Sequence, residues 1–160
     1  MTMASNASVL GETAVRRRPI ALAWWLRVVG AFYVLQFIAN ALLQAPVRTV
    51  GPAGVLDRAS AGDSTARFLV DTWITLGLEI GSIGVALLIA SWKPEQARAL
   101  VWTILGIEIV RGIVNDVYML TRGYDPTVFV TWIIIHSVVI VTGLIVLRSA
   151  RSEPVSVGRP

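Results

Sequence analysis

The chain has 160 residues, of which 55% are hydrophobic and 15% charged, and its mean hydropathy is +0.69. Soluble domains carry about 25% charged residues, so this composition argues against a separate soluble domain. The sequence contains no cysteine, which excludes disulfides, thiolate metal sites and cysteine redox chemistry. The formal charge of +4 would indicate nucleic-acid binding only if the basic residues formed one face, and most of them instead lie at the ends of apolar stretches, so we expect no nucleic-acid partner.

Four apolar stretches follow one another along the chain, at residues 21–43, 68–92, 99–120 and 128–147. Each is long enough to cross a bilayer core, which takes about 20 helical residues. A water-soluble four-helix bundle is the alternative, but it would need a polar face on each helix. We therefore predict an all-α fold: an integral membrane four-helix bundle over residues 20–147, between disordered cytoplasmic tails at 1–19 and 148–160.

The distribution of basic residues predicts the orientation. The two tails and the connection 93–98 together hold eight Lys and Arg residues, whereas the other two connections hold four. The positive-inside rule then places both termini in the cytoplasm of a multi-pass protein of the inner (plasma) membrane. The long connection 45–67 lies outside in this topology, and its length favours a short surface helix or a lid. Arg16–Arg18 before an apolar run resembles a signal peptide, but the run is too long and Arg27 interrupts it, so we expect it to be retained.

Ionisable residues within the third stretch form the strongest pattern. At about 100° per residue, Glu108, Arg111, Asn115 and Tyr118 share one stripe of a helix, whereas Asp116 lies off this stripe. Glu108 and Arg111 are three residues apart, so they can pair on one face. Either a self-neutralising pair that locks the bundle or a functional site would explain this spacing, because charged groups at membrane depth are costly.

The second stretch places Asp71, Thr75 and Glu79 on one side of a helix, four residues apart. Glu79 has no cation on its own helix, so its partner must be Arg111, Arg27, His136, a ligand or its own proton. Gly77 and Gly81 in the same stretch indicate close helix packing.

The first and fourth stretches add isolated polar groups. Gln36 and Asn40 are four residues apart and suit hydrogen bonding between helices. Arg27 lies near the cytoplasmic edge, where its side chain can reach the headgroups. His136 is the single histidine, so a metal site would need carboxylates for its other ligands, and we predict none.

Acidic groups outnumber basic ones among these interior positions. Bare carboxylates are very costly in a low dielectric, so at least one should be protonated, should bind a cation, or should meet water. An outward-facing polar pocket would account for all of them. Its candidate residues are Gln36, Asn40, Asp71, Glu79, Glu108, Arg111, Asn115, Asp116 and His136.

The start of the first stretch, Trp24-Trp25-Leu26-Arg27-Val28-Val29-Gly30-Ala31-Phe32-Tyr33-Val34-Leu35-Gln36-Phe37, resembles the BphX-like family. These are small bacterial integral membrane proteins named for association with biphenyl-degradation genes, and DoxX-like proteins share their architecture. The resemblance implies four spans and a bacterial inner-membrane setting. The family has no assigned reaction, so the resemblance transfers no catalytic residue.

Three functions fit this pattern. The first is a membrane protein whose polar pocket binds a small hydrophobic or amphipathic ligand, or which serves as an accessory subunit of a larger complex. The second is an integral membrane enzyme of the isomerase or cyclase kind, with Glu79 or Glu108 as general acid and His136 relaying protons. The third is a proton-coupled transporter, which would act as a homo-oligomer. The sequence carries no cofactor motif, so we expect membrane lipids and a small ligand as its partners.

Overall fold

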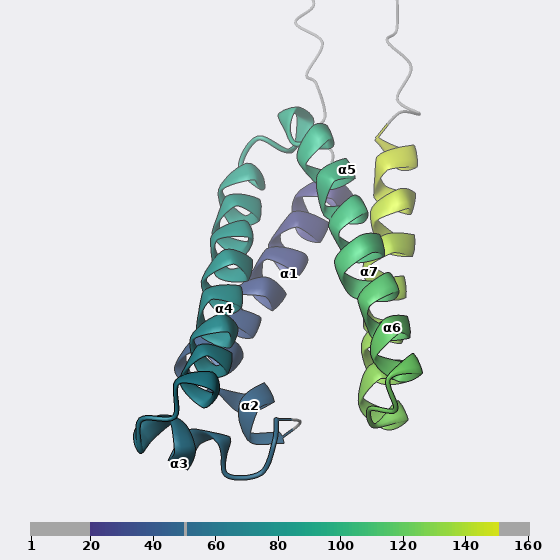
Figure 1. Ribbon diagram of the computed structural model, residues 1–160. Coiled ribbons are helices and arrows are strands. Elements are labelled where there is room, and N and C mark those ends of the chain that lie inside the picture. Colours follow the sequence, from purple (N-terminus) through teal and green to yellow (C-terminus); the bar gives the residue numbers. More distant parts are fainter. Residues whose placement is uncertain (1–19, 50, 151–160) are drawn as a thin grey trace, which may run out of the picture.

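The computed structural model describes residues 20–49 and 51–150, and within these ranges all regular elements are helical (Figure 1). The predicted tail at 1–19 and residues 151–160 of the predicted tail at 148–160 lie outside the described residues, and the last helix continues to Ser149. In chain order the elements are α1 Ile20–Phe37, the π-helix η1 Ile38–Leu42, α2 Ala45–Thr49, α3 Val55–Ser60, α4 Ser64–Ala90, the 3-10 turn η2 Pro94–Gln96, α5 Arg98–Ile107, the π-helix η3 Glu108–Val114, α6 Asn115–Thr121 and α7 Pro126–Ser149.

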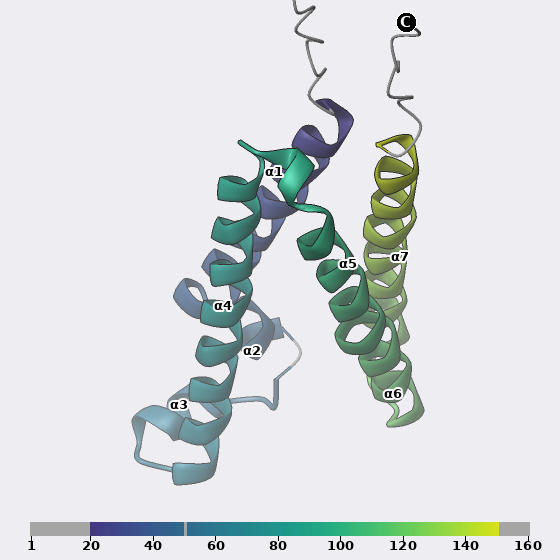
Figure 2. The same cartoon turned by 90° about the horizontal axis from the view of Figure 1, so that it is seen from above.

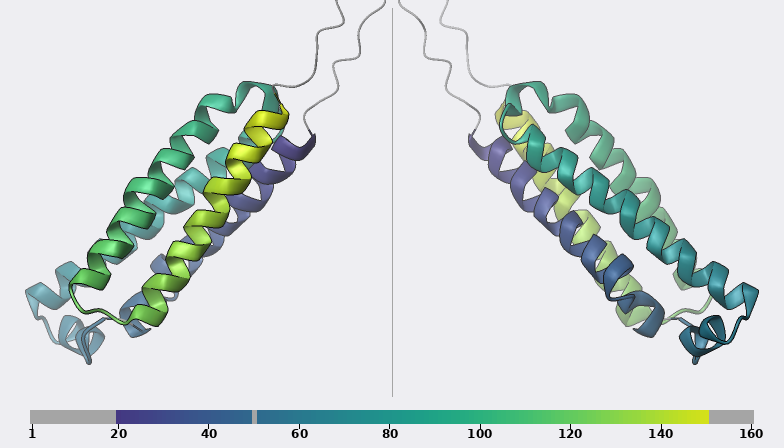
Figure 3. Two further views of the ribbon diagram at one scale, coloured as in Figure 1. Left: turned by 90° about the vertical axis from the view of Figure 1, so that its right-hand side faces the viewer. Right: turned by 90° about the vertical axis from the view of Figure 1, so that its left-hand side faces the viewer.

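The long elements form two antiparallel pairs. Helix α1 packs along α4, and the continuous run α5–η3–α6 packs along α7, while α1 also touches α7 (Figures 1 and 2). The start of α1, the turn η2 and the end of α7 lie together at one end of the molecule (Figure 3). Helices α2 and α3 and the turn between α6 and α7 lie at the other end. Each long element therefore runs from one end of the molecule to the other, and α7 ends at the end where α1 begins.

Glycines allow α1 and α4 to approach closely. A Cβ atom on Gly84 would come within 2.8 Å of the backbone oxygen of Gly30 and 2.9 Å of the backbone nitrogen of Val34. Similarly, Gly77 faces Asn40 and Ala41. The prediction that the glycines of the second stretch serve close helix packing is confirmed.

The connection between α1 and α4 is folded, not extended. Val47 of α2 and Val55 of α3 are buried in one apolar cluster with Ala66 and Val70 of α4. The prediction of a short surface helix in this connection is confirmed, with two helices in place of one. Helix α4 begins at Ser64, earlier than the apolar stretch, because the Asp63 carboxylate accepts hydrogen bonds from the N–H groups of the first turn.

Much of the outer surface of the long helices is apolar. Val28 and Leu35 of α1 and Ile134 and Ile145 of α7 are all more than half exposed. Three helical segments are long and apolar enough to cross a membrane, at Ile20–Leu42, Ser64–Ala90 and Pro126–Ser149. An apolar exterior of this extent and these three helices are consistent with a membrane protein.

The predicted third span differs from the other three. Residues 98–121 are helical throughout, but the π-helix η3 divides them into three shorter elements. This region carries Glu108, Arg111 and Asp116, so it is also the most polar of the four stretches. In the described part of the chain, three helical segments are therefore long and apolar enough to cross a membrane, and 98–121 is not among them.

Candidate functional site

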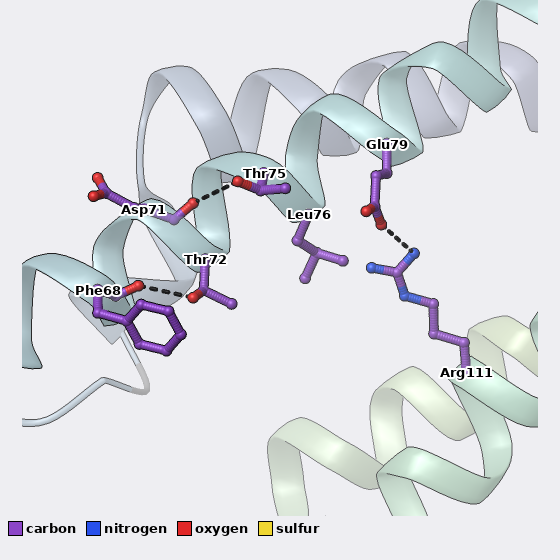
Figure 4. A pocket seen from close by; sticks show the side chains of 7 residues that line it. All are labelled: Phe68, Asp71, Thr72, Thr75, Leu76, Glu79 and Arg111. Atoms are coloured by element: carbon purple, nitrogen blue, oxygen red, sulfur yellow. Dashed lines mark hydrogen bonds and ion pairs between the residues drawn. The ribbon is translucent and has the colours of Figure 1, made fainter.

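The first polar site is a pocket between α4 and η3. Its volume is about 440 Å³, and it lies toward the end of α4 that carries α2 and α3 (Figure 4). It is lined by Phe68, Asp71, Thr72, Thr75, Leu76, Glu79 and Arg111. Asp71, Thr75 and Glu79 were predicted to share one side of a helix, and all three face this pocket. Phe68 and Leu76 give the same pocket an apolar part.

Glu79 and Arg111 meet across the pocket. The Arg111 Nη1 atom lies 3.6 Å from Glu79 Oε2, and the side chains are 40% and 62% exposed in the protein (Figure 4). Of the partners considered for Glu79, the structure selects Arg111. The i,i+3 pair between Arg111 and Glu108 is wrong, because Glu108 points into the interior of the protein and Arg111 points toward α4.

The second polar site is a buried cluster around Glu108. This carboxylate is only 2% exposed. The Tyr33 hydroxyl of α1 donates a hydrogen bond to Oε1, and the His136 imidazole of α7 donates from Nδ1 to Oε2. On the other side of the imidazole ring, Nε2 lies 3.5 Å from Asp116 Oδ2. We call Tyr33, Glu108, Asp116 and His136 the buried polar cluster.

The π-helix brings Glu108 and Asp116 to the same side. In a regular α-helix these residues would differ by about 80° around the axis, as eight steps of about 100° leave that remainder. The turn of η3 is wider, with i→i+5 hydrogen bonds, so each residue rotates around the helix axis by less than it would in an α-helix. The predicted stripe of Glu108, Arg111, Asn115 and Tyr118 is therefore wrong: Asp116 faces His136, whereas Asn115 and Tyr118 are exposed.

Gly112 makes room for the histidine. A Cβ atom at this position would come within 2.5 Å of the His136 ring. The ring also contacts Trp132, with 5.9 Å between ring centroids. Position 112 therefore needs glycine to keep the imidazole between the two carboxylates.

The buried polar cluster is built around the imidazole ring of His136. Its two carboxylates approach opposite nitrogens of one imidazole ring, so they do not converge on a common point. Asp116 Oδ2 is buried and receives no hydrogen bond from the described residues. Among the described residues, no three histidine, aspartate or glutamate side chains are arranged so that they could hold a metal ion.

Three of the remaining candidates lie apart from both sites. Asn40 donates to the Gln36 backbone oxygen at 2.6 Å and to the Gln36 Oε1 atom at 3.3 Å. These bonds are within one helix and adjoin the π-helix η1, so the predicted hydrogen bonding between helices is not what the structure shows. Asn115 is exposed on the surface of α6.

Sequence reasoning missed Tyr33, Phe68 and Leu76 as members of these sites. Phe68 and Leu76 read as ordinary apolar residues of a span. Tyr33 carried a usable signal, because a buried tyrosine hydroxyl needs a hydrogen-bond partner. It is 5% exposed, and Glu108 supplies that partner.

Comparison with known proteins places the chain in one family. The model of the BphX-like family matches residues 20–152. An uncharacterized BphX-like protein of Burkholderia cepacia is 26% identical over 133 residues, covering 81% of this chain and 92% of that protein. A similar protein of Paraburkholderia xenovorans (strain LB400) has the same identity and coverage. No solved structure matches the chain. Because the family match covers most of the sequence, including the segment in which the resemblance was seen, the chain belongs to the BphX-like family.

Proposed function

We propose that this protein binds a small amphipathic molecule in the pocket between α4 and η3. The observation that carries the proposal is the composition of the pocket wall: Glu79, Arg111 and Asp71 lie beside Phe68 and Leu76. Ligand sites are typically concave and largely apolar, with a few convergent polar groups, and about 300–1,000 Å³ in volume. A volume of about 440 Å³ fits this range.

The ion pair between Arg111 and Glu79 is long enough for both groups to bind a ligand. At 3.6 Å, the Arg111–Glu79 separation exceeds the about 2.7–2.9 Å of a strong charge-assisted hydrogen bond. Both side chains also keep exposed area within the pocket. Arg111 can therefore bind an oxygen of a ligand while Glu79 or Asp71 accepts from a ligand hydroxyl or amine, and the apolar part of the ligand lies on Phe68 and Leu76.

The proposal includes four spans, with α5–η3–α6 as the third, and both termini in the cytoplasm of a bacterial inner membrane. Three observations support it: the start of α1 and the end of α7 lie at one end of the molecule (Figure 1), the two tails and the connection 93–98 hold eight basic residues in the sequence against four in the other two connections, and residues 98–121 form an unbroken helical run. The pocket then opens toward the outer leaflet.

An introduced thiol tests pocket and orientation together, because the chain has no cysteine of its own. In intact cells, Thr75→Cys should react with a membrane-impermeant thiol reagent, since Thr75 lines the pocket. Lys93→Cys, beside η2 at the other end, should react only after the membrane is permeabilised. Labelling is read from the mass of the purified protein.

Val85→Cys is the matched control on the same helix. Val85 is 51% exposed but does not line the pocket, so under the proposal it meets lipid and stays unlabelled. An unreactive Thr75→Cys, or labelling of Lys93→Cys in intact cells, would count against the proposal.

A second candidate function rests on the buried polar cluster. A hydroxyl, two carboxylates and an imidazole in contact can pass a proton between α1, α7 and α6, as a proton-coupled transporter or a proton-donating enzyme requires. None of these residues lines the pocket, however. Proton-gradient-dependent uptake into vesicles would favour transport, and turnover by purified protein would favour an enzyme.

A further inference from the structure

A second pocket lies at the opposite end of the molecule from the first. It has a volume of about 320 Å³ and lies where α1 begins and α4 ends. Its lining is Ile20, Ala23, Trp24, Arg27, Ser91, Trp92 and Pro94. This lining combines one cation with two tryptophans and belongs to no site described above.

The guanidinium of Arg27 is held in a defined position within this pocket. Its Nε atom donates to Ser91 Oγ at 3.4 Å, and its Cζ atom lies 5.5 Å from the centroid of the Trp24 ring. Ser91 Oγ in turn donates to the Leu88 backbone oxygen at 2.6 Å, so it is itself fixed at the end of α4. These contacts occupy Nε and one face of the guanidinium.

Arg27 carries a charge that no carboxylate among the described residues neutralises. The ion pairs among the described residues do not involve Arg27, and the two Nη groups have no hydrogen bond within that part of the chain. Lys93 and Arg98 flank the same turn and add positive charge, against the single carboxylate of Glu95. A planar guanidinium with two free amino groups is a good donor to a phosphate.

We propose that this pocket binds the phosphate of an anionic phospholipid headgroup. Arg27 donates to the phosphate oxygens from its Nη groups, and the exposed rings of Trp24 and Trp92 border the glycerol region. Trp24 is 59% and Trp92 71% exposed, and Ile20 beside them is 69% exposed. These exposed apolar side chains favour a lipid as the ligand, because tryptophans concentrate at membrane interfaces. A soluble phosphate has no apolar part that could pack against them.

Tryptophan quenching in vesicles tests this site. The full chain is reconstituted in phosphatidylcholine vesicles that contain a minor fraction of brominated phosphatidylglycerol, or the same fraction of brominated phosphatidylcholine. The ratio of the two quenching efficiencies measures headgroup selectivity and cancels effects of the substitution on fluorescence itself. One basic residue near an anionic surface contributes about fivefold in partitioning, so Arg27→Gln should lower the ratio about fivefold. Arg27→Lys, which keeps the charge but loses the planar fork, should lower it less.

Arg67→Gln is the matched control, because Arg67 is an exposed arginine at the other end of α4. It should leave the ratio unchanged. An unchanged ratio in Arg27→Gln would overturn the proposal, as would an equal loss in Arg67→Gln. Loss of the selectivity when inorganic phosphate is added at millimolar concentration would assign the site to free phosphate and equally overturn the lipid assignment.

Discussion

Replacing Glu108 with leucine is expected to lower the free energy of unfolding by about 3–5 kcal/mol, the range for removing one partner from a buried pair of ionisable groups. Glu108 is 2% exposed and accepts from both Tyr33 and His136. Leucine would leave the tyrosine hydroxyl and the imidazole Nδ1 without their acceptor, and α1 and α7 would lose the hydrogen-bond partner that they share on η3. Unfolding in mixed micelles, followed by circular dichroism, measures the change.

A conservative variant and a control variant provide the comparison for that result. Glu108→Gln keeps an oxygen for the Tyr33 hydroxyl, so it should cost about 1–3 kcal/mol, as for one unsatisfied buried group. Glu95→Gln, at an exposed position of η2, should leave stability within about 0.5 kcal/mol of the unsubstituted protein. If Glu108→Leu were as stable as Glu95→Gln, Glu108 would not be the centre of a buried cluster.

Replacing Gly84 with alanine is expected to cost about 1–3 kcal/mol, the range for overpacking a well-packed interface. The new Cβ would meet backbone atoms of Gly30 and Val34 at 2.8 and 2.9 Å. Backbone atoms cannot rotate out of the way as a flexible side chain can, so α1 would have to move away from α4. The same unfolding measurement reports the loss.

Gly106→Ala is the control for this substitution. Gly106 is also in a helix, but a Cβ there would have nothing within 4 Å. Alanine favours a helix interior by about 0.5–1 kcal/mol over glycine, so this variant should be as stable as the unsubstituted protein or slightly more stable. Equal effects of the two substitutions would show that α1 and α4 do not meet at Gly84.

The helices and their close approach could be predicted from the sequence because those features depend on local pattern. Long apolar runs located the three helices that are long and apolar enough to span a membrane, and the glycines of the second run, such as Gly77 and Gly81, indicated where a neighbour packs closely. Asp71, Thr75 and Glu79 were correctly placed on one side because α4 is a regular helix throughout. In such a helix, the spacing of residues alone determines which of them face the same way.

The arrangement of the third run could not be predicted in this way. A helical wheel assumes a constant turn, and the π-helix at Glu108–Val114 changes that turn in the middle of the polar residues. It moved Asp116 toward His136 and separated Glu108 from Arg111. Which side chains pair between two helices depends on how the helices pack in the tertiary structure. The sequence therefore left several candidate partners for Glu79 until the positions of α4 and η3 were known.

The π-helix also explains why the polar residues divide into two sites. From η3, Arg111 points toward α4 and the open pocket (Figure 4). Glu108, in contrast, hydrogen-bonds to Tyr33 of α1 and His136 of α7. One short segment therefore contributes to a partly exposed charged pair and to a buried cluster. Because π-helical turns are frequent at functional sites, η3 is the segment whose geometry we expect function to depend on most.

Mass spectrometry of small molecules that co-purify with the protein tests the proposed pocket most directly. The unsubstituted protein should carry a small amphipathic molecule that is absent from preparations of Arg111→Met and Glu79→Gln, since both residues line the pocket. Both variants should remain folded, because a partly exposed ion pair contributes only about 0–1 kcal/mol. Arg122→Met, at an exposed position after α6, should retain the molecule. A molecule kept at the same level by all four folded proteins, or no molecule on the unsubstituted protein, would contradict ligand binding between Glu79 and Arg111.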